Sequence, residues 1–262
     1  MLSQPLVSII TPTVTCGPLI RRAIDSVRRQ DYPYLEHIIV GDPCAENALT
    51  SLTALAEEQP HGVPLRVCNA PRPVSDIATY RPARAAYARM AGVRAAGGGL
   101  LAFLDDDNEY EPGHITAMVR AIQGRPHLQA VYCWRQLVHP DGSPYLTPAS
   151  PWQGHPERAR RDYADLVAAG VWVPGTNLLR DSLATNTVDS SCWLLHRELL
   201  TRVPFRITYH VQEREARLGE DVAFCFDLQR HAIPVSHVPQ HSVRYYLGGF
   251  STSGNRDYIA TF

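Results

Sequence analysis

Short apolar runs alternate with amphipathic segments along the first 110 residues of the chain. The apolar runs have the length of strands and occupy residues 6–12, 35–42, 65–70 and 100–104. The segments between them repeat apolar residues at helical spacing, which predicts helices over residues 18–30, 47–59 and 82–96. Regular alternation of this kind predicts an α/β fold with a mostly parallel sheet and helices on both faces.

The pattern is less regular after residue 110. Helical spacing recurs over residues 112–124, 157–170 and 219–231, and strand-like runs lie at residues 130–138, within 187–199, and at 235–248. Residues 139–156 are rich in Pro, Gly and Ser, which is typical of a loop. We see no internal repeat and no linker, so we expect a single domain over residues 1–262.

Composition narrows the class of protein. The chain has 262 residues, of which 45% are hydrophobic, enough to bury the core of a substantial α/β domain. A net charge of -1 gives no general attraction to nucleic acid. No apolar run approaches the roughly 20 residues that span a bilayer, and the first residues lack the basic segment of a signal peptide. Six scattered cysteines indicate reduced thiols, so we expect a soluble cytoplasmic protein.

The sequence contains no lysine, so all 25 basic residues are arginines. This excludes Schiff-base catalysis, pyridoxal phosphate attachment and the lysine of a phosphate-binding P-loop. Phosphate must then be met by arginine, by backbone N–H groups or by a metal ion. Hydrolysis by a serine or zinc mechanism is disfavoured, because neither G-x-S-x-G nor H-E-x-x-H occurs.

The predicted strands end in residues suited to ligand binding. In an open parallel sheet the ligand binds beyond the carboxyl ends of the strands. Pro12, Asp42, the segment after Asn69, and the acids 105–107 stand at those ends and are expected to share one edge of the sheet.

Asp105, Asp106 and Asp107 form an acidic run directly after the fourth predicted strand. An EF-hand is excluded, because its Gly and Glu positions hold Tyr110 and Thr116. Capping of the following helix explains one acid at most. The run then indicates either a solvated turn or an Asp-x-Asp site for magnesium or manganese, which such sites often share with a diphosphate.

Three stretches occur in a recognisable order. The first is VSIITPTVTCGPLIRRAIDSVRRQDYPYLEHIIVGD, with a strand and Pro, a helix, Q-x-Y-P, and a strand that ends in an acid. The second is ARMAGVRAAGGGLLAFLDDDNEYEPGHI, and the third is GEDVAFCFDLQRH, with Glu-Asp ahead of an apolar helix. In this order they resemble glycosyltransferase family 2, the inverting nucleotide-sugar transferases of the GT-A fold. The chain departs from relatives at Met90, where they commonly carry Asn, and at GDPCAEN, where they carry D-D-G-S.

The resemblance implies a GT-A type, Rossmann-like sheet fused to a smaller acceptor-binding part. Residues 1–110 are then the nucleotide-sugar-binding half and residues 111–262 the acceptor-binding half. The implied partners are a UDP-, dTDP- or GDP-sugar donor and an unidentified hydroxyl acceptor, with no nucleic acid. The implied cofactor is a divalent ion, Mn or Mg.

The resemblance also assigns roles at the strand ends. Asp107 aligns with the last Asp of the Asp-x-Asp motif and is expected to hold the metal. Asp105 and Asp106 are expected to contact the ribose or the ion, so Asp105 is a second metal candidate. Asp42 is expected to bind the base of the nucleotide. Pro12 and Arg84 complete the predicted nucleotide contacts.

The third stretch provides the predicted general base. An inverting transfer needs one carboxylate beside the acceptor hydroxyl, and Asp221 is our candidate. Glu220 is the alternative, and either acid suits a helix N-terminus in any case. His237 and His241 are candidates for the third metal ligand that relatives often recruit, although ordinary surface histidines are as consistent with their spacing.

Two other functions are compatible with these features. A nucleotidyltransferase acting on sugar phosphates also places acids and a metal at the edge of an α/β sheet, but it usually carries a Gly-rich, basic loop near the N-terminus, which this chain lacks. A non-catalytic nucleotide-sugar-binding protein is the second alternative. The metal-dependent inverting glycosyltransferase is the leading hypothesis.

Overall fold

The computed structural model of the chain describes residues 4–14, 17–41, 48–57, 62–249 and 252. Its strands are β1 (Val7–Thr13), β2 (Leu35–Gly41), β3 (Leu65–Asn69), β4 (Leu100–Phe103), β5 (Glu109–Tyr110), β6 (Ala130–Val138), β7 (Leu178–Leu179), β8 (Trp193–His196) and β9 (Val235–Tyr246). Its α-helices are α1 (Pro18–Arg28), α2 (Ala48–Glu57), α3 (Ser75–Ala78), α4 (Arg81–Ala95), α5 (His114–Gln123), α6 (Pro156–Ala168), α7 (Leu199–Arg202), α8 (Val211–Glu215) and α9 (Glu220–Arg230). Two short 3-10 turns, η1 (Leu183–Thr185) and η2 (Ser190–Cys192), precede β8.

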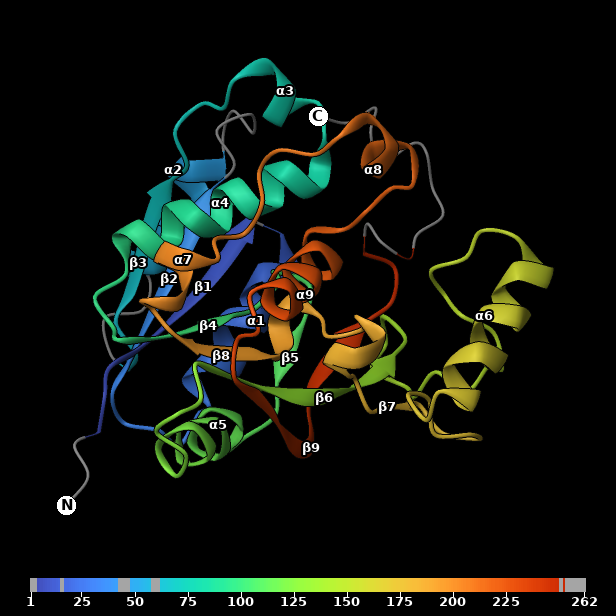
Figure 1. Ribbon diagram of the computed structural model, residues 1–262. Helices are drawn as coiled ribbons and strands as arrows, with labels where there is room; N and C mark the ends of the chain where they lie inside the picture. Colours follow the sequence, from blue (N-terminus) through green and yellow to red (C-terminus); the bar gives the residue numbers. More distant parts are fainter. Residues whose placement is uncertain (1–3, 15–16, 42–47, 58–61, 250–251, 253–262) are drawn as a thin grey trace.

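All the described strands belong to one sheet, in the order β3-β2-β1-β4-β8-β6-β9-β5, with β7 added beside β6. The first four strands of this order are parallel to one another. β8 is antiparallel to both β4 and β6, and β9 runs parallel to β6. Figure 1 shows helices packed on the sheet and α6 standing apart, on the side of the molecule away from β3. The predicted α/β architecture is confirmed.

The N-terminal elements form where the apolar pattern predicts them. β1 and β2 are almost completely buried, as expected for strands covered on both faces. α1 buries one stripe that includes Ile20, Ala23, Ile24 and Val27 and leaves its arginines at the edges of that stripe. Pro18 occupies the first turn, where no helical N–H is lost.

Small residues of α4 are buried against the sheet. A Cβ added to Gly92 would lie 2.4 Å from Cγ2 of Ile10 and 2.9 Å from Cγ2 of Val40, both of which point up from the buried strands. The absence of a side chain at residue 92 therefore sets the distance between α4 and the strands that carry the candidate site.

We expect Gly92→Ala to lower the free energy of unfolding by about 1–3 kcal/mol, because overpacking costs more than the roughly 1 kcal/mol of helix propensity that Ala gains. Gly99→Ala is the matched control, since nothing lies within 4 Å of a Cβ at that position. Urea denaturation of both variants measures the difference. Equal midpoints for the two variants would contradict the proposed close packing.

The carboxyl ends of the parallel strands meet at one edge of the sheet. Thr13 is in register with Gly41, and Gly41 with Asn69, so β1, β2 and β3 end side by side. β4 ends at Phe103, opposite Ile10, and the acidic run follows it at the same edge. The predicted shared edge is confirmed for these strands, while Asp42 lies outside the described residues.

The second half of the chain completes the sheet. β6 covers residues 130–138 as predicted, and β9 continues through Pro239, where the pairing with β6 is interrupted by irregular register shifts. The short elements α3, β5, β7, α7 and α8 are not predicted from the sequence, because two to five residues carry too little periodic pattern. Within the described ranges, none of the helices combines the length and apolar character needed to cross a membrane.

Candidate active site

The three acids of the acidic run have different partners. Asp105 accepts a hydrogen bond of 2.5 Å from Nη2 of Arg89, a buried arginine of α4, and its carboxylate lies 3.5 Å from Oγ of Ser190. Asp106 accepts a hydrogen bond of 2.5 Å from Oγ1 of Thr13, the last residue of β1. Two of the three carboxylates are therefore tied to neighbouring elements.

Asp107 is held through its backbone rather than its carboxylate. Its carbonyl oxygen accepts a hydrogen bond of 2.6 Å from Arg22, whose guanidinium stacks over the ring of Tyr246 at 3.4 Å. The carboxylate faces Gly249, where an added Cβ would come within 2.0 Å of Oδ2. Among the residues that the structure describes, none forms an ion pair with this carboxylate.

Burial raises the pKa of each of the three acids. For Asp107 the next causes are the negative charges of Asp106 and Asp105, and its pKa lies well above the usual range. For Asp105 burial outweighs the opposing charge of Arg89 and raises the pKa to about 7. Thr13 partly offsets the effect of burial on the pKa of Asp106, which stays raised. Carboxylates that are desolvated and repel one another favour a cation beside them.

The residues present fit a metal site that the donor completes. In the described part of the chain no three His, Cys, Asp or Glu side chains gather as a ready-made metal cage. Asp107 has no ion-pair partner among the described residues and stands next to two further carboxylates. It offers hard oxygen ligands, and Mg²⁺ sites of this kind take their remaining ligands from phosphate and water. His237 and His241 both pack against the ring of Trp134, with ring centroids 5.6 and 5.1 Å from it.

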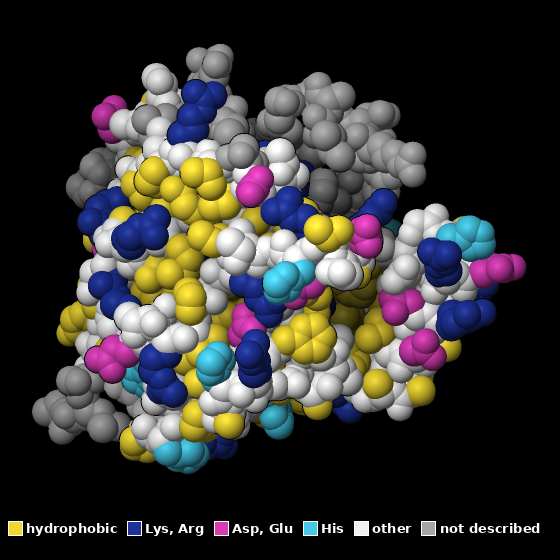
Figure 2. Space-filling model, turned by 45° about the horizontal axis from the view of Figure 1, so that its top comes forward, with side chains coloured by type: hydrophobic (Ala, Val, Ile, Leu, Met, Phe, Trp, Pro, Cys, Tyr) yellow, Lys and Arg dark blue, Asp and Glu magenta, His cyan; other side chains and the backbone are white. Residues whose placement is uncertain are grey.

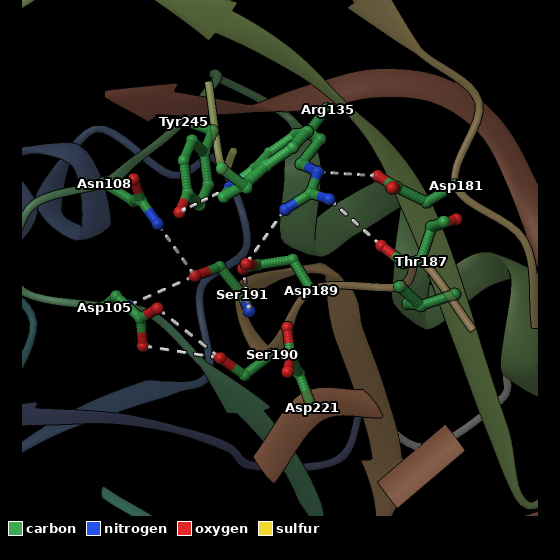
Figure 3. A network of polar contacts seen from close by, with 12 residues as sticks. Asp105, Asn108, Arg135, Asp181, Thr187, Asp189, Ser190, Ser191, Asp221 and Tyr245 are labelled. Carbon is green, nitrogen blue, oxygen red and sulfur yellow. Dashed lines mark hydrogen bonds and ion pairs between the residues drawn. The ribbon is translucent and has the colours of Figure 1, made fainter. Parts of the chain in front are cut away.

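Asp221 lies in the first turn of α9, and its side chain points toward Asp189 and Ser190 (Figure 3). Its Oδ1 accepts a hydrogen bond of 2.8 Å from the backbone N–H of Val222. A Cβ on Gly219 would come within 2.5 Å of that oxygen, so the residue before the helix must be small. Burial, followed by the charges of Glu220 and Asp189, raises the pKa of Asp221 to about 7.

A polar network links the acidic run to the second half of the chain (Figure 3). The backbone N–H of Asp105 and the side-chain amide of Asn108 both donate to Oγ of Ser191 at 3.2 Å. Ser191 in turn donates its backbone N–H to Asp189, at 2.9 Å. These bonds connect the loop after β4 to the η2 turn that precedes β8.

The network continues from Asp189 to a buried arginine of β6. Arg135 donates to Asp189 at 3.0 Å and forms an ion pair with Asp181 at 3.1 Å. Burial raises the pKa of Asp181 to about 8 in spite of that arginine. Arg135 also lies over the rings of Trp152 and Tyr245, at 5.2 and 5.0 Å. These contacts of Arg135 hold Asp189 in place next to Asp221 (Figure 3).

The surface is hollowed between the part that carries α6 and the rest of the molecule, with hydrophobic side chains along the hollow (Figure 2). α6 packs there through half-buried Tyr163, Leu166 and Val167, which belong to an aromatic-rich cluster with Trp152 and Trp172.

The remaining predicted site residues lie in the following places. Pro12 stands in β1 one residue before Thr13, and Arg84 is half-buried in the first turns of α4. Their predicted nucleotide contacts stay predictions. Asp105, Asp106 and Asp107 follow one another at the sheet edge. Asp221 points toward Ser190 and Asp189, and Ser190 lies 3.5 Å from the carboxylate of Asp105 (Figure 3).

Sequence reasoning missed several residues of the site, namely Thr13, Arg89, Arg135, Asp181, Asp189, Ser190 and Ser191. A signal was present for Arg89, since helical spacing places it on the same face as the buried residues Ala86 and Val93. A charge on a buried face requires a partner, but the pattern does not identify which one.

Comparison with known proteins agrees with the α/β fold described above. The profile of Glycosyl transferase family 2 matches residues 8–200. The chain therefore belongs to glycosyltransferase family 2.

Among curated proteins, the chain is 24% identical over 261 residues to the uncharacterized glycosyltransferase YibD of Escherichia coli (strain K12), covering 97% of this chain and 64% of that protein. It is 31% identical over 117 residues to the uncharacterized glycosyltransferase YwdF of Bacillus subtilis (strain 168), covering 45% of this chain and 38% of that protein. The chain thus spans less than two thirds of the length of these relatives.

Solved structures share the fold at low identity. The mannosyltransferase PcManGT from Pyrobaculum calidifontis, in complex with GDP-Man and Mn²⁺, superposes with a TM-score of 0.63 at 17% identity, over 96% of this chain and 59% of that chain. TarS 1-349 of S. aureus, in complex with UDP-GlcNAc, gives 0.61 at 15% identity, over 95% and 61%. The GT-A fold predicted from the sequence is confirmed.

Proposed function

We propose that the protein is a metal-dependent inverting glycosyltransferase that moves a sugar from a nucleoside-diphosphate sugar to an acceptor hydroxyl. The observation that carries this proposal is the carboxylate of Asp107 at the strand ends, where none of the described residues pairs with it, together with Asp221 of α9, which points toward Ser190 beside Asp105 (Figure 3). The sugar-nucleotide complexes of two proteins with this fold support it.

In this proposal the strand-end acids bind the donor. Asp107 would hold the metal ion, and a bound divalent ion would supply positive charge to the departing diphosphate. Asp105 is held by Arg89, so it contributes through its charge or through the water shell of the ion. Pro12, Asp42, Arg84 and Asp106 are the proposed nucleotide contacts. The Mn²⁺ complex of PcManGT supports a divalent ion here.

Asp221 is the proposed general base. The acceptor oxygen attacks the anomeric carbon from the face opposite the diphosphate while its proton passes to Asp221. The bond from the anomeric carbon to the diphosphate oxygen breaks with its electron pair, so the configuration inverts. A carboxylate whose pKa is raised to about 7 is a better proton acceptor than one near 4 and is still ionised at neutral pH in half of the molecules.

The division of labour between the halves is part of the proposal. Residues 1–110 contribute the strand ends that bind the donor, and residues 111–262 contribute Asp221 and the hollow beside α6 for the acceptor. A nucleotidyltransferase or a non-catalytic sugar-nucleotide-binding protein would keep the strand-end acids but would not need Asp221.

Metal-dependent binding of nucleoside diphosphate tests the donor site. We expect UDP or GDP to raise the melting temperature only when Mn²⁺ or Mg²⁺ is present, because a ligand that binds the folded state stabilises it by an amount that grows with the ratio of its concentration to its dissociation constant. Asp107→Ala should abolish the shift. Thermal denaturation with each nucleotide, with and without metal and with EDTA, measures it.

Asp25→Ala is the control for this experiment, since Asp25 is an exposed acid of α1 whose carboxylate forms a surface pair with Arg28 at 3.6 Å. It should retain the full shift. Stabilisation that needs no metal and survives Asp107→Ala would overturn the site assignment. A panel of nucleotide sugars, assayed for slow hydrolysis, identifies the donor without knowledge of the acceptor.

A further inference from the structure

Arg89 is the most completely buried charge beside the acidic run. Its side chain is 2% exposed. Nη2 donates to Oδ1 of Asp105 at 2.5 Å and to Oγ of Ser190 at 2.7 Å, and Nη1 donates to Oε1 of Glu220 at 2.6 Å. One side chain of α4 therefore joins the loop after β4, the η2 turn and the first residue of α9.

Stability alone does not account for this arrangement. Burying an arginine with two carboxylates removes the hydration of all three ions, and replacing such groups with apolar residues is often neutral or stabilising. The gain from Arg89 is geometric, because a planar guanidinium can hold two carboxylates at fixed angles through separate N–H groups.

The contacts of Arg89 distinguish the two acids at the start of α9. One carboxylate oxygen of Glu220 accepts a hydrogen bond from Arg89, and the Glu220 side chain is 16% exposed. Asp221, the next residue, bonds only the N–H of Val222 among the residues described, and it points toward Asp189 and Ser190 (Figure 3). Glu220 anchors the helix, while Asp221 keeps its carboxylate available to an incoming hydroxyl.

We propose that Arg89 is a positioning residue that sets the separation between the donor-binding acids and the base Asp221, acting through Glu220. The inference rests on the proposed function, since it assigns a role within the transfer step. Asp105 stands two residues from the proposed metal ligand Asp107, and Glu220 stands one residue from the base, so the guanidinium is a fixed link between the two chemical groups of the site.

A kinetic comparison tests this role, with hydrolysis of the nucleotide sugar found in the donor panel as the assay. Arg89→Lys keeps the charge but replaces the fork with one ammonium group. We expect its kcat to fall on the order of 10- to 100-fold, as for a misplacement near 1 Å, with the donor KM unchanged within about threefold. Glu220→Ala should lose a similar factor in kcat, and Glu220→Gln, which still offers an oxygen to Arg89, should recover part of it.

The double variant separates positioning from independent damage. Because both residues act through one link, Arg89→Lys combined with Glu220→Ala should be no slower than the worse single variant. Arg206→Lys is the matched control. Arg206 also bridges two carboxylates, Glu213 at 2.6 Å and Asp227 at 2.7 Å, and it also holds α9, but through Asp227 and not through the first-turn residue Glu220. Its kcat should stay within about twofold of wild type.

Three outcomes would overturn the proposal. These are wild-type kcat in Arg89→Lys, losses that multiply in the double variant, or an equal loss of kcat in Arg206→Lys. If Arg89→Lys does not fold, Glu220→Ala and Glu220→Gln decide the question, since both keep the arginine paired with Asp105. The proposed function would fail by a different result. Either the wild type hydrolyses no nucleotide sugar, or Asp221→Asn remains fully active. In both cases the proposed role of Arg89 would be wrong as well.

Discussion

Replacing Asp221 with Asn is expected to abolish sugar transfer and to leave donor binding intact. Asn has the same shape, and its oxygen can still accept the hydrogen bond from the N–H of Val222, so the first turn of α9 should not change. It cannot take a proton. Loss of a general base typically costs about 10²–10⁴-fold in rate, so kcat should fall by that factor.

The measurement pairs two assays on the same variant. Transfer or hydrolysis of the nucleotide sugar reports catalysis, and the metal-dependent thermal shift with nucleoside diphosphate reports donor binding. Asp25→Asn, on the exposed face of α1, is the control and should keep both. Full activity of Asp221→Asn would remove Asp221 as the base, and a comparable loss in Glu220→Gln alone would transfer the role to Glu220.

The sequence predicts where the strands and helices of this fold lie along the chain better than it predicts which strands pair with one another. The apolar runs locate β1, β2, β4 and β6 within a residue or two, because each is short, buried and bounded by polar or turn-forming residues. The pattern does not show that β8 enters the sheet antiparallel between β4 and β6. Strand periodicity reports which residues are buried but not which strand lies alongside.

The Q-x-Y-P stretch illustrates the same limit in a motif. It helped to identify the family, yet its residues are structural. Gln30 donates to the backbone of Glu111 at 3.0 Å and accepts from the N–H of Ile115 at 3.1 Å, which ties the end of α1 to the start of α5. Tyr32 donates to the carbonyl oxygen of Pro5 at 2.7 Å. A motif locates a family, whereas the contacts show what each residue does.

The candidate site was predicted in part for the same physical reason. An acidic run at a strand end and a Glu-Asp pair at a helix start are local patterns, so Asp107 and Asp221 could be proposed from the sequence. Arg89 could not be assigned, because its partner Glu220 lies 131 residues away along the chain. In the sequence, nothing distinguishes Asp189 from any other acid that precedes a strand. Only the structure shows that Arg135 donates a hydrogen bond to it.

The rate of transfer is expected to fall steeply below neutral pH. Burial is the largest cause that raises the pKa of Asp221 to about 7, followed by the charges of Glu220 and Asp189, while Arg135 opposes the shift. Tyr209 also faces this group, and its pKa is raised, so it stays neutral at these pH values. A general base works only when it is ionised. Because its pKa is raised, Asp221 is protonated and inactive at pH values below about 7.

We therefore expect kcat to be nearly constant above about pH 8 and to lose about tenfold per unit below 7, reaching about a hundredfold loss at pH 5. The profile is measured at saturating donor and Mn²⁺, so that protonation of the strand-end acids does not limit donor binding. Glu220→Gln provides the internal check. It removes a negative charge that raises the pKa of Asp221, so whatever activity it keeps should persist to lower pH than in the wild type. A profile that stays flat to pH 5, or an acid limb that Glu220→Gln leaves unmoved, would show that the group that titrates is not Asp221.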